Sequence, residues 1–108
     1  MEIRHYLTAE RVDPFQVWLD GIKDATTRVV ILRRLDRVAA GDFGDRKFCG
    51  EGVWELRIDH GPGYRVYYGQ AGKVLVLLLC GDTKRIQTRD IQMAIKFWAD
   101  FKRRSHDT

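Results

Sequence analysis

The most regular alternation of apolar and polar residues in the chain runs through residues 53–59. Because the side chains of a strand point alternately to its two faces, this pattern predicts one apolar and one polar face. The apolar positions are Trp54, Leu56 and Ile58, and the polar positions are Glu55, Arg57 and Asp59. Residues 64–69 alternate in the same way, with Tyr64, Val66 and Tyr68 against Arg65 and Tyr67. Residues 73–80 are apolar on both faces, which predicts a third, central strand.

Only one antiparallel register lets the apolar sets of the first two strands share a face. It pairs Arg57 with Arg65 and Glu55 with Tyr67, because a shift by one residue would turn charged side chains into the core. Like charges placed directly opposite each other destabilise a sheet by some tenths of a kcal/mol or more. An arginine pair in this position therefore favours a binding face for an anion. The alternative is a solvated face whose arginines pair with Glu55 and Asp59.

The N-terminal part of the chain predicts a strand and then two helices. Residues 2–8 alternate as a strand does. Asp13 and Pro14 are typical of a helix start, because aspartate caps the first turn and proline fits the first helical position. Asp24 is expected to cap a second helix that ends near Gly41. Its buried stripe would be Ile31, Leu35 and Val38, with Arg28, Arg33, Arg34 and Arg37 on the surface.

Two further segments complete the predicted order of elements. Residues 41–52 contain four glycines and mixed charges, which predicts a loop, and residues 81–85 form a basic turn. Thr88 is expected to cap a last helix, whose apolar side carries Ile91, Ala94, Ile95, Trp98 and Phe101. The order is then β-α-α-β-β-β-α. We predict a single α+β domain over residues 1–108, with a mainly antiparallel sheet, an N-terminal helical hairpin and a C-terminal helix.

Composition adds a mild positive charge and argues against several classes of protein. Nineteen Lys and Arg against fifteen Asp and Glu give a formal charge of +4, which favours encounters with nucleic acid or acidic proteins without specifying one. The two cysteines, Cys49 and Cys80, have no metal-ligand spacing, and Cys80 is expected to be buried at a strand end. With no secretory signal and no apolar run long enough for a membrane span, we expect free thiols and a cytoplasmic location. Neither a metal nor another cofactor is expected.

The central block W-E-L-R-I-D-H-G-P-G-Y-R-V-Y-Y is followed by an apolar strand and G-D-T-K-R-I-Q-T-R-D-I. This combination resembles the RelE/HigB toxin superfamily, and within it the short HigB-like group called addiction-module killer proteins. The likeness covers nearly the whole chain, although the central block is its only fairly specific part. It implies a RelE-like fold and the toxin of a type II toxin–antitoxin system.

The resemblance also implies an activity and partners. Such toxins are ribosome-dependent endoribonucleases that cleave messenger RNA without a metal, by attack of a ribose 2′-OH on the adjacent phosphate. The implied partners are the ribosome, the messenger RNA and a co-encoded helix-turn-helix, HigA-like antitoxin, with which the toxin forms a hetero-oligomer.

Several basic residues match the family's phosphate-binding positions. Arg65 matches the arginine that follows the hairpin turn, and Arg57 lies where relatives often carry a basic strand residue. Lys84 and Arg85 correspond to a basic position beside the scissile phosphate. Guanidinium groups suit this task because they bind phosphate through two donors, and a positioned donor that meets developing charge lowers the barrier by roughly 3 kcal/mol. Lys47, in the preceding loop, is a further candidate for substrate binding.

The groups for proton transfer depart from the family pattern. Many relatives carry a Tyr or His near the C-terminus, whereas the equivalent position here is near Ile91, and the C-terminal His106 lies in the tail. Glu55 is a candidate general base, an orienting partner of Arg57, or a member of an ordinary ion pair. His60 could shuttle protons or be a solvated turn residue. Tyr67 could stack on an RNA base, donate a hydrogen bond to it, or simply cover the sheet.

Two alternatives of other classes follow from this incomplete catalytic set. One is a non-enzymatic toxin that resembles the ParE branch and inhibits DNA gyrase by binding. The other is an inactive nucleic-acid-binding remnant.

Overall fold

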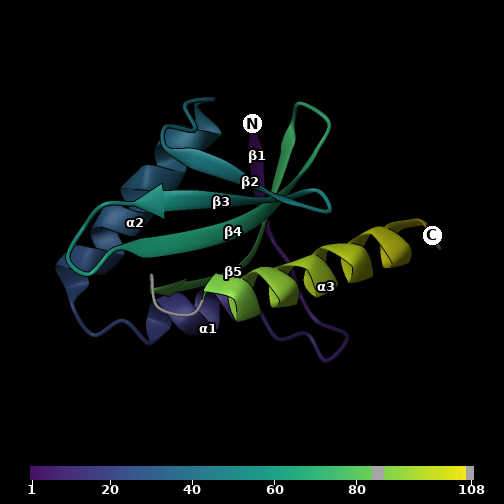
Figure 1. Ribbon diagram of the computed structural model, residues 1–108, viewed down its shortest axis with the longest axis horizontal. Coiled ribbons are helices and arrows are strands. Elements are labelled where there is room, and N and C mark those ends of the chain that lie inside the picture. The colour runs from purple at the N-terminus through teal and green to yellow at the C-terminus, as the bar shows by residue number, and fades with distance from the viewer. Residues whose placement is uncertain (84–86, 107–108) are drawn as a thin grey trace.

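A computed structural model describes residues 1–83 and 87–106 of the chain (Figure 1). Its elements are β1 (Glu2–His5), α1 (Pro14–Asp20), α2 (Ala25–Ala39), β2 (Arg46–Gly50), β3 (Val53–Ile58), β4 (Tyr64–Ala71), β5 (Leu75–Thr83) and α3 (Gln87–His106). The strands form one sheet in the order β1-β5-β4-β3-β2, in which β1 is parallel to β5 and the other neighbours are antiparallel. The predictions of an α+β chain and a mainly antiparallel sheet are confirmed.

The predicted register of the central hairpin is also confirmed. β3 and β4 pair Arg57 with Arg65 and Glu55 with Tyr67. The turn between them contains Gly61 and Gly63 at φ angles of 55° and 89°, a region that glycine enters without a steric penalty. The hairpin therefore has one face that is apolar and another that gathers the charged residues.

The predicted caps of α1 and α2 are confirmed, whereas the predicted cap of the last helix is wrong by at least one residue. The Asp13 carboxylate accepts a hydrogen bond from the backbone N–H of Gln16 at 3.0 Å, and Asp24 accepts one from Thr26 at 3.1 Å. α3 begins at Gln87, one residue before the expected cap at Thr88. None of the helices in the described part of the chain combines the length and apolar character that a bilayer span requires.

The expectation of a loop over residues 41–52 is wrong for its second half, which forms β2. This strand pairs Lys47 with Glu55 and Phe48 with Trp54 at the outer edge of the sheet. Most of its side chains are exposed, so the burial that would create an alternating pattern is missing. An edge strand of this kind is fixed by backbone hydrogen bonds to β3, which the side-chain pattern does not report.

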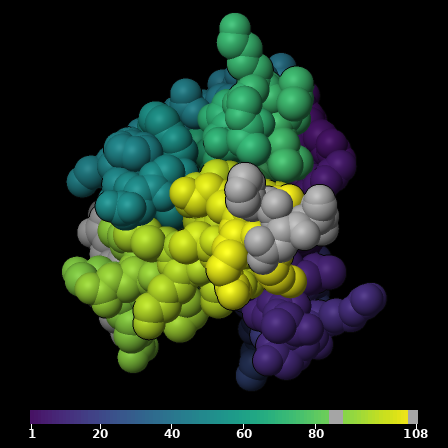
Figure 2. All heavy atoms as spheres, turned by 90° about the vertical axis from the view of Figure 1, so that its right-hand side faces the viewer, coloured from purple at the N-terminus to yellow at the C-terminus, as the bar shows by residue number. Residues whose placement is uncertain are grey.

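Helices cover both faces of the sheet, so the molecule has three layers (Figure 1). α1 and α2 pack on the apolar face of the hairpin through Phe15, Leu19, Ile31, Leu35 and Val38, which meet Leu56, Ile58, Val66, Tyr68, Val76 and Leu78. α3 packs on the opposite face through Ala94 and Trp98, which meet Val53, Tyr67, Leu77, Leu79 and Cys80. Figure 2 shows the C-terminal end of α3 (yellow) facing the viewer, with the β4–β5 turn (green) above it.

Glycines in the sheet let two tryptophans lie close to it. A Cβ atom at Gly69 would lie 2.2 Å from Cε3 of Trp98, and one at Gly81 would lie 2.3 Å from Cε3 of Trp18. Trp98 belongs to α3 and Trp18 to α1. On each face of the sheet, therefore, a glycine without a side chain leaves room for a tryptophan of the covering helix. These contacts fix the distance at which α1 and α3 approach the sheet.

β5 contains one extra residue relative to β4. Tyr67 pairs with Cys80 but the next residue, Tyr68, pairs with Leu78, so Leu79 has no partner across the strand. Leu79 and Cys80 consequently both belong to the core under α3. Such a bulge reverses the alternation of the strand beyond it. It lets β5 continue to Thr83, where the sequence predicts a turn from residue 81.

Candidate functional site

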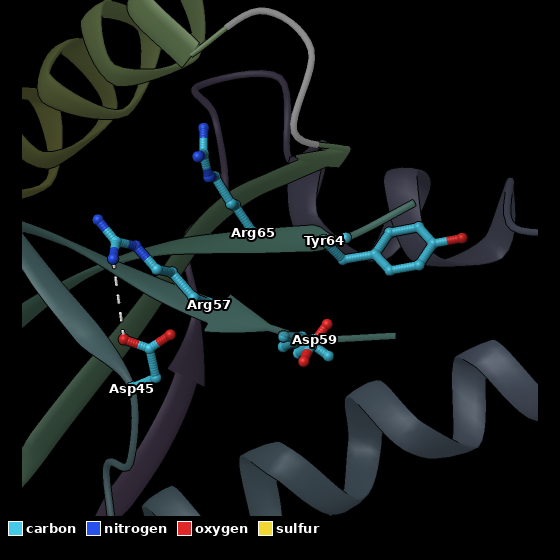
Figure 3. A pocket seen from close by; sticks show the side chains of 7 residues that line it. Asp45, Arg57, Asp59, Tyr64 and Arg65 are labelled. Atoms are coloured by element: carbon cyan, nitrogen blue, oxygen red, sulfur yellow. Dashed lines mark ion pairs between the residues drawn. The ribbon is translucent and has the colours of Figure 1, made fainter. Parts of the chain in front are cut away.

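Arg57 and Arg65 point to the same side of the hairpin, the side that α3 covers (Figure 3). They line a hollow of about 550 Å³ near the β3–β4 turn, which we call the open end of the sheet. The other lining residues are Asp45, Ile58, Asp59, Gly63 and Tyr64. The Arg57 side chain is 39% exposed, whereas that of Arg65 is 10% exposed. Arg57 is therefore the guanidinium that a molecule in the hollow reaches first. The hollow falls within the size range of small-molecule sites.

The Glu55 carboxylate forms ion pairs with both guanidinium groups. Its side chain is completely buried, with Oε2 at 2.9 Å from Nε of Arg57 and Oε1 at 3.4 Å from Nε of Arg65. The Tyr67 hydroxyl lies 3.4 Å from the same Oε1. This carboxylate is buried and does not line the hollow, which favours the orienting role over that of a general base. The role as a general base stays a prediction. Its geometry is that of a group that orients the two arginines.

The protonation of this cluster follows from the same contacts. The hydrogen bond from Arg57 to Glu55 raises the pKa of the guanidinium above its already high value. Burial and then the negative charge of Glu55 raise the pKa of Tyr67 well above its usual range, so this phenol stays protonated. Tyr67 is fully buried, and the expectation of a ring exposed for stacking on a base is therefore wrong.

A pair of carboxyl groups lies on the other side of Arg65. Asp82 of β5 pairs with Arg65 across the sheet, and Asp90 projects from the first turn of α3. Burial, followed by the hydrogen bond with Asp82 and the charge of Asp82, raises the pKa of Asp90 to about 6. The sequence does not predict this pair, because the bulge that turns Asp82 toward α3 leaves no signal in the alternation.

The remaining predicted site residues separate into three groups. Lys47 is exposed on β2 and, as the residue paired with Glu55, shares the face of the cluster. His60 lies on the opposite side, where its Nε2 is 3.2 Å from Oγ1 of Thr27 in the first turn of α2, so the structure does not bring it to the arginines. Lys84 and Arg85 lie outside the described residues.

Two aspartates that the sequence did not single out for binding line the hollow. The Asp45 carboxylate lies 3.9 Å from Nη1 of Arg57 (Figure 3), and the backbone carbonyl of Asp45 accepts a hydrogen bond from the backbone N–H of Arg57 at 3.0 Å. Asp59 follows β3 and is exposed. Asp45 lies in the segment predicted as a loop, and only its pairing with β3 brings it to the site. Within residues 1–83 and 87–106, no group of three His, Cys, Asp or Glu side chains is placed to hold a metal ion.

Comparison with known proteins gives a relative in Haemophilus influenzae, whose name is "Uncharacterized protein". The two sequences are 45% identical over 80 residues, which cover 74% of this chain and 81% of the relative. The chain belongs to the family of this Haemophilus protein. No protein-family model matches the chain. The relative's name assigns no activity, so the resemblance to RelE/HigB toxins remains a prediction.

Proposed function

We propose that the chain is the toxin of a type II toxin–antitoxin system, with a RelE-like fold and a ribosome-dependent endoribonuclease activity. The observation that carries the proposal is the pair Arg57 and Arg65, held on one side of a rigid hairpin by the buried Glu55 and bordering an open hollow. Positioned guanidinium groups of this kind suit an RNA phosphate. The proposed partners are the ribosome, messenger RNA and a HigA-like antitoxin, and the proposed location is the cytoplasm.

In the proposed reaction the ribose 2′-oxygen bonds to the adjacent phosphorus, and the bond from phosphorus to the next 5′-oxygen breaks. The proton leaves the 2′-OH and a proton is gained by the 5′-oxygen, which gives a 2′,3′-cyclic phosphate and a 5′-hydroxyl. Arg57 donates to the phosphate oxygens that gain charge, Arg65 adds positive charge from the wall of the hollow, and Glu55 orients both. The predicted roles of Lys84 and Arg85 stay predictions.

Arg57→Ala is the sharpest test, because Arg57 is the exposed member of the pair. Induction of the wild-type chain without an antitoxin should stop growth and create new 5′ ends in translated messages. Arg57→Ala should reduce cleavage by about 10²–10³-fold, the usual effect of losing one donor to a developing negative charge. Arg57→Lys should retain part of the activity, because it keeps the charge but loses the two-pronged geometry.

Arg103→Ala serves as the matched control, since it also removes one exposed arginine, from the far end of α3. It should cleave as the wild type does. Circular dichroism spectra of the purified variants should overlap, which separates a lost activity from a lost fold. Full cleavage by a folded Arg57→Ala variant would overturn the assignment of the site.

One observation favours the gyrase-inhibiting alternative. Glu55 occupies donors of both arginines, and Arg65 is almost completely buried, which leaves fewer free donors for a phosphate. Growth arrest with DNA breaks and without new RNA ends would establish this alternative. Normal growth of cells that contain the folded wild-type chain would instead establish an inactive remnant.

A further inference from the structure

A second hollow, of about 420 Å³, adjoins the first on the side of α2. The two hollows share lining residues, among them Arg57 and Asp59, so that together they form one groove along the open end of the sheet. The second hollow is lined by three arginines of α2 in addition to Arg57. These are Arg33, Arg34 and Arg37, and we call the second hollow the α2 groove.

The two exposed arginines that α2 contributes to this groove, Arg33 and Arg37, make few other interactions. Arg33 makes no ion pair or hydrogen bond through its side chain with any residue that the structure describes. Arg37 pairs with Asp42 at 2.9 Å, but both partners are more than half exposed, and such a pair contributes only about 0–1 kcal/mol. Residues four apart on a helix are neighbours, so Arg33 and Arg37 present two adjacent guanidinium groups.

Arg34 adds a buried positive charge behind them. The expectation that Arg34 lies on the surface is wrong, because its side chain is packed under the loop that precedes β2. Its Nη2 donates to the Asp45 carbonyl at 3.1 Å, whereas its Nη1 is buried without a hydrogen-bond partner among the described residues. Burial, and then the charge of Arg37, lowers its pKa.

The loop is shaped around this guanidinium group. Gly44 has a φ of 61°, and a Cβ atom there would lie 2.7 Å from Nη2 of Arg34. Within the described chain no carboxylate lies within ion-pair distance of Arg34. The charges of Asp42 and Asp45 favour the charged form of Arg34 but compensate for its burial only in part, since its pKa is still lowered. An anion in the adjoining groove would offset the remaining cost.

We propose that the α2 groove binds the phosphodiester backbone of single-stranded RNA next to the scissile phosphate, an inference that rests on the proposed function and extends its site. The groove carries four arginines against two lining carboxylates, Asp45 and Asp59. Its described lining holds no aromatic side chain, so it has no platform on which bases would stack. The binding is therefore to phosphates and is insensitive to base sequence.

The test measures binding of a fluorescein-labelled, fully 2′-O-methylated 12-nucleotide RNA by fluorescence anisotropy over a series of salt concentrations. This probe has no free 2′-OH and stays intact whether or not the chain is a nuclease. For single strands, the slope of log K against log salt decreases by about 0.7 for each phosphate that the protein no longer neutralises. The double variant Arg33→Ala/Arg37→Ala should therefore lower the slope by roughly 1.4 and weaken binding about tenfold at low salt.

The C-terminal end of α3 lies at the opposite end of the molecule from α2 (Figure 1). Arg103→Ala, in that part of α3, removes an exposed positive charge away from the α2 groove and should leave the slope unchanged. A double variant that binds with the slope of this control would overturn the proposal, as would a wild-type chain that does not bind the probe. Displacement of the probe by polyglutamate as readily as by unlabelled RNA would also overturn it, in favour of an acidic protein. The proposed function fails separately, if binding depends on Arg33 and Arg37 but translated messages are not cleaved.

Discussion

The hydroxyl of Tyr67 and the carboxylate of Glu55 meet between β3 and β4 at 3.4 Å, and both side chains are completely buried. A buried carboxylate is tolerated only where opposite charge and hydrogen bonds compensate for the loss of water. Arg57 and Arg65 supply that charge from the two strands that carry Glu55 and Tyr67. The exposed guanidinium group of Arg57 is thus held in place by the carboxylate of Glu55, which solvent does not reach.

Glu55→Gln removes this charge with little change in volume. We expect the free energy of unfolding to fall by about 3–5 kcal/mol, because Arg65 would stay buried without its counter-charge. Urea unfolding followed by tryptophan fluorescence measures the loss. Glu2→Gln is the control, since Glu2 pairs with Arg4 on the surface and its loss should change stability by about 1 kcal/mol or less. A similar small change for both variants would show that the buried cluster is not held by its charges.

The raised pKa of Asp90 gives the fold a defined dependence on pH. Between about pH 4, the usual aspartate pKa, and about pH 6, the folded chain holds this proton while the unfolded chain has released it. The contribution of Asp90 to the free energy of unfolding therefore falls as pH rises through this window. The size is roughly 1–2 kcal/mol, less than the shift alone implies, because the carboxyl is partly exposed.

Asp90→Asn should remove this contribution, so the variant should be more stable than the wild type at pH 7 and lose the advantage toward pH 4. The quantity to compare is the difference in unfolding free energy between the two proteins at each pH. A difference is needed because Asp24, Asp42 and Asp100 have lowered pKa values and act in the opposite direction. A difference that does not vary with pH would contradict the assignment.

Gly69→Ala tests the close approach of α3 to the sheet. The added methyl group would overlap the ring of Trp98, and we expect a loss of about 1–3 kcal/mol, as is typical of overpacked cores. Gly21→Ala is a matched control, because the nearest atom to its Cβ is the Trp18 carbonyl oxygen at 3.4 Å and its φ is −74°. That change should be neutral or slightly stabilising. Thermal unfolding of both variants makes the comparison.

The two cysteines should differ in reactivity. Burial raises the pKa of the Cys80 thiol to about 12, whereas Cys49 is only partly buried and its pKa is raised as well. Because the thiolate is the reactive form, a thiol reagent at pH 8 should modify Cys49 slowly and leave Cys80 intact in the folded chain. Mass spectrometry counts the modified thiols. Rapid labelling of a folded Cys49→Ser variant would show that Cys80 is accessible.

The alternation of apolar and polar residues was sufficient to predict the β3–β4 hairpin, but not that α3 packs on its charged face. The alternation of residues 54–58 and 64–68 fixes which residues pair, and it correctly places Arg57 beside Arg65. It also suggests that a charged face is a solvated face. Here Glu55 pairs with both arginines and offsets part of their charge, so this face could receive α3. The burial of Tyr67 and Glu55 depends on that tertiary contact.

For Arg34 the sequence did contain a signal of burial, its position in the helix, but the charge of the side chain favoured a surface location instead. It lies three residues after Ile31 and four before Val38, so helical spacing places it on the buried stripe of α2. Arginine is seldom buried, and that rule favoured the surface. The strand β2 had no comparable signal, because only backbone pairing with β3 defines it.

The extra residue, Leu79, reverses the alternation of side chains between the two halves of β5. Before it, even-numbered positions turn toward α1 and α2; after it, Gly81 turns toward Trp18 and Asp82 toward Arg65. A regular strand of the same sequence, without the bulge, would exchange the two, placing the Asp82 carboxylate under the indole ring of Trp18 and a glycine on the side of Arg65. The carboxylate beside the arginine pair thus depends on an irregularity in the backbone of β5, as well as on which residues the strand contains.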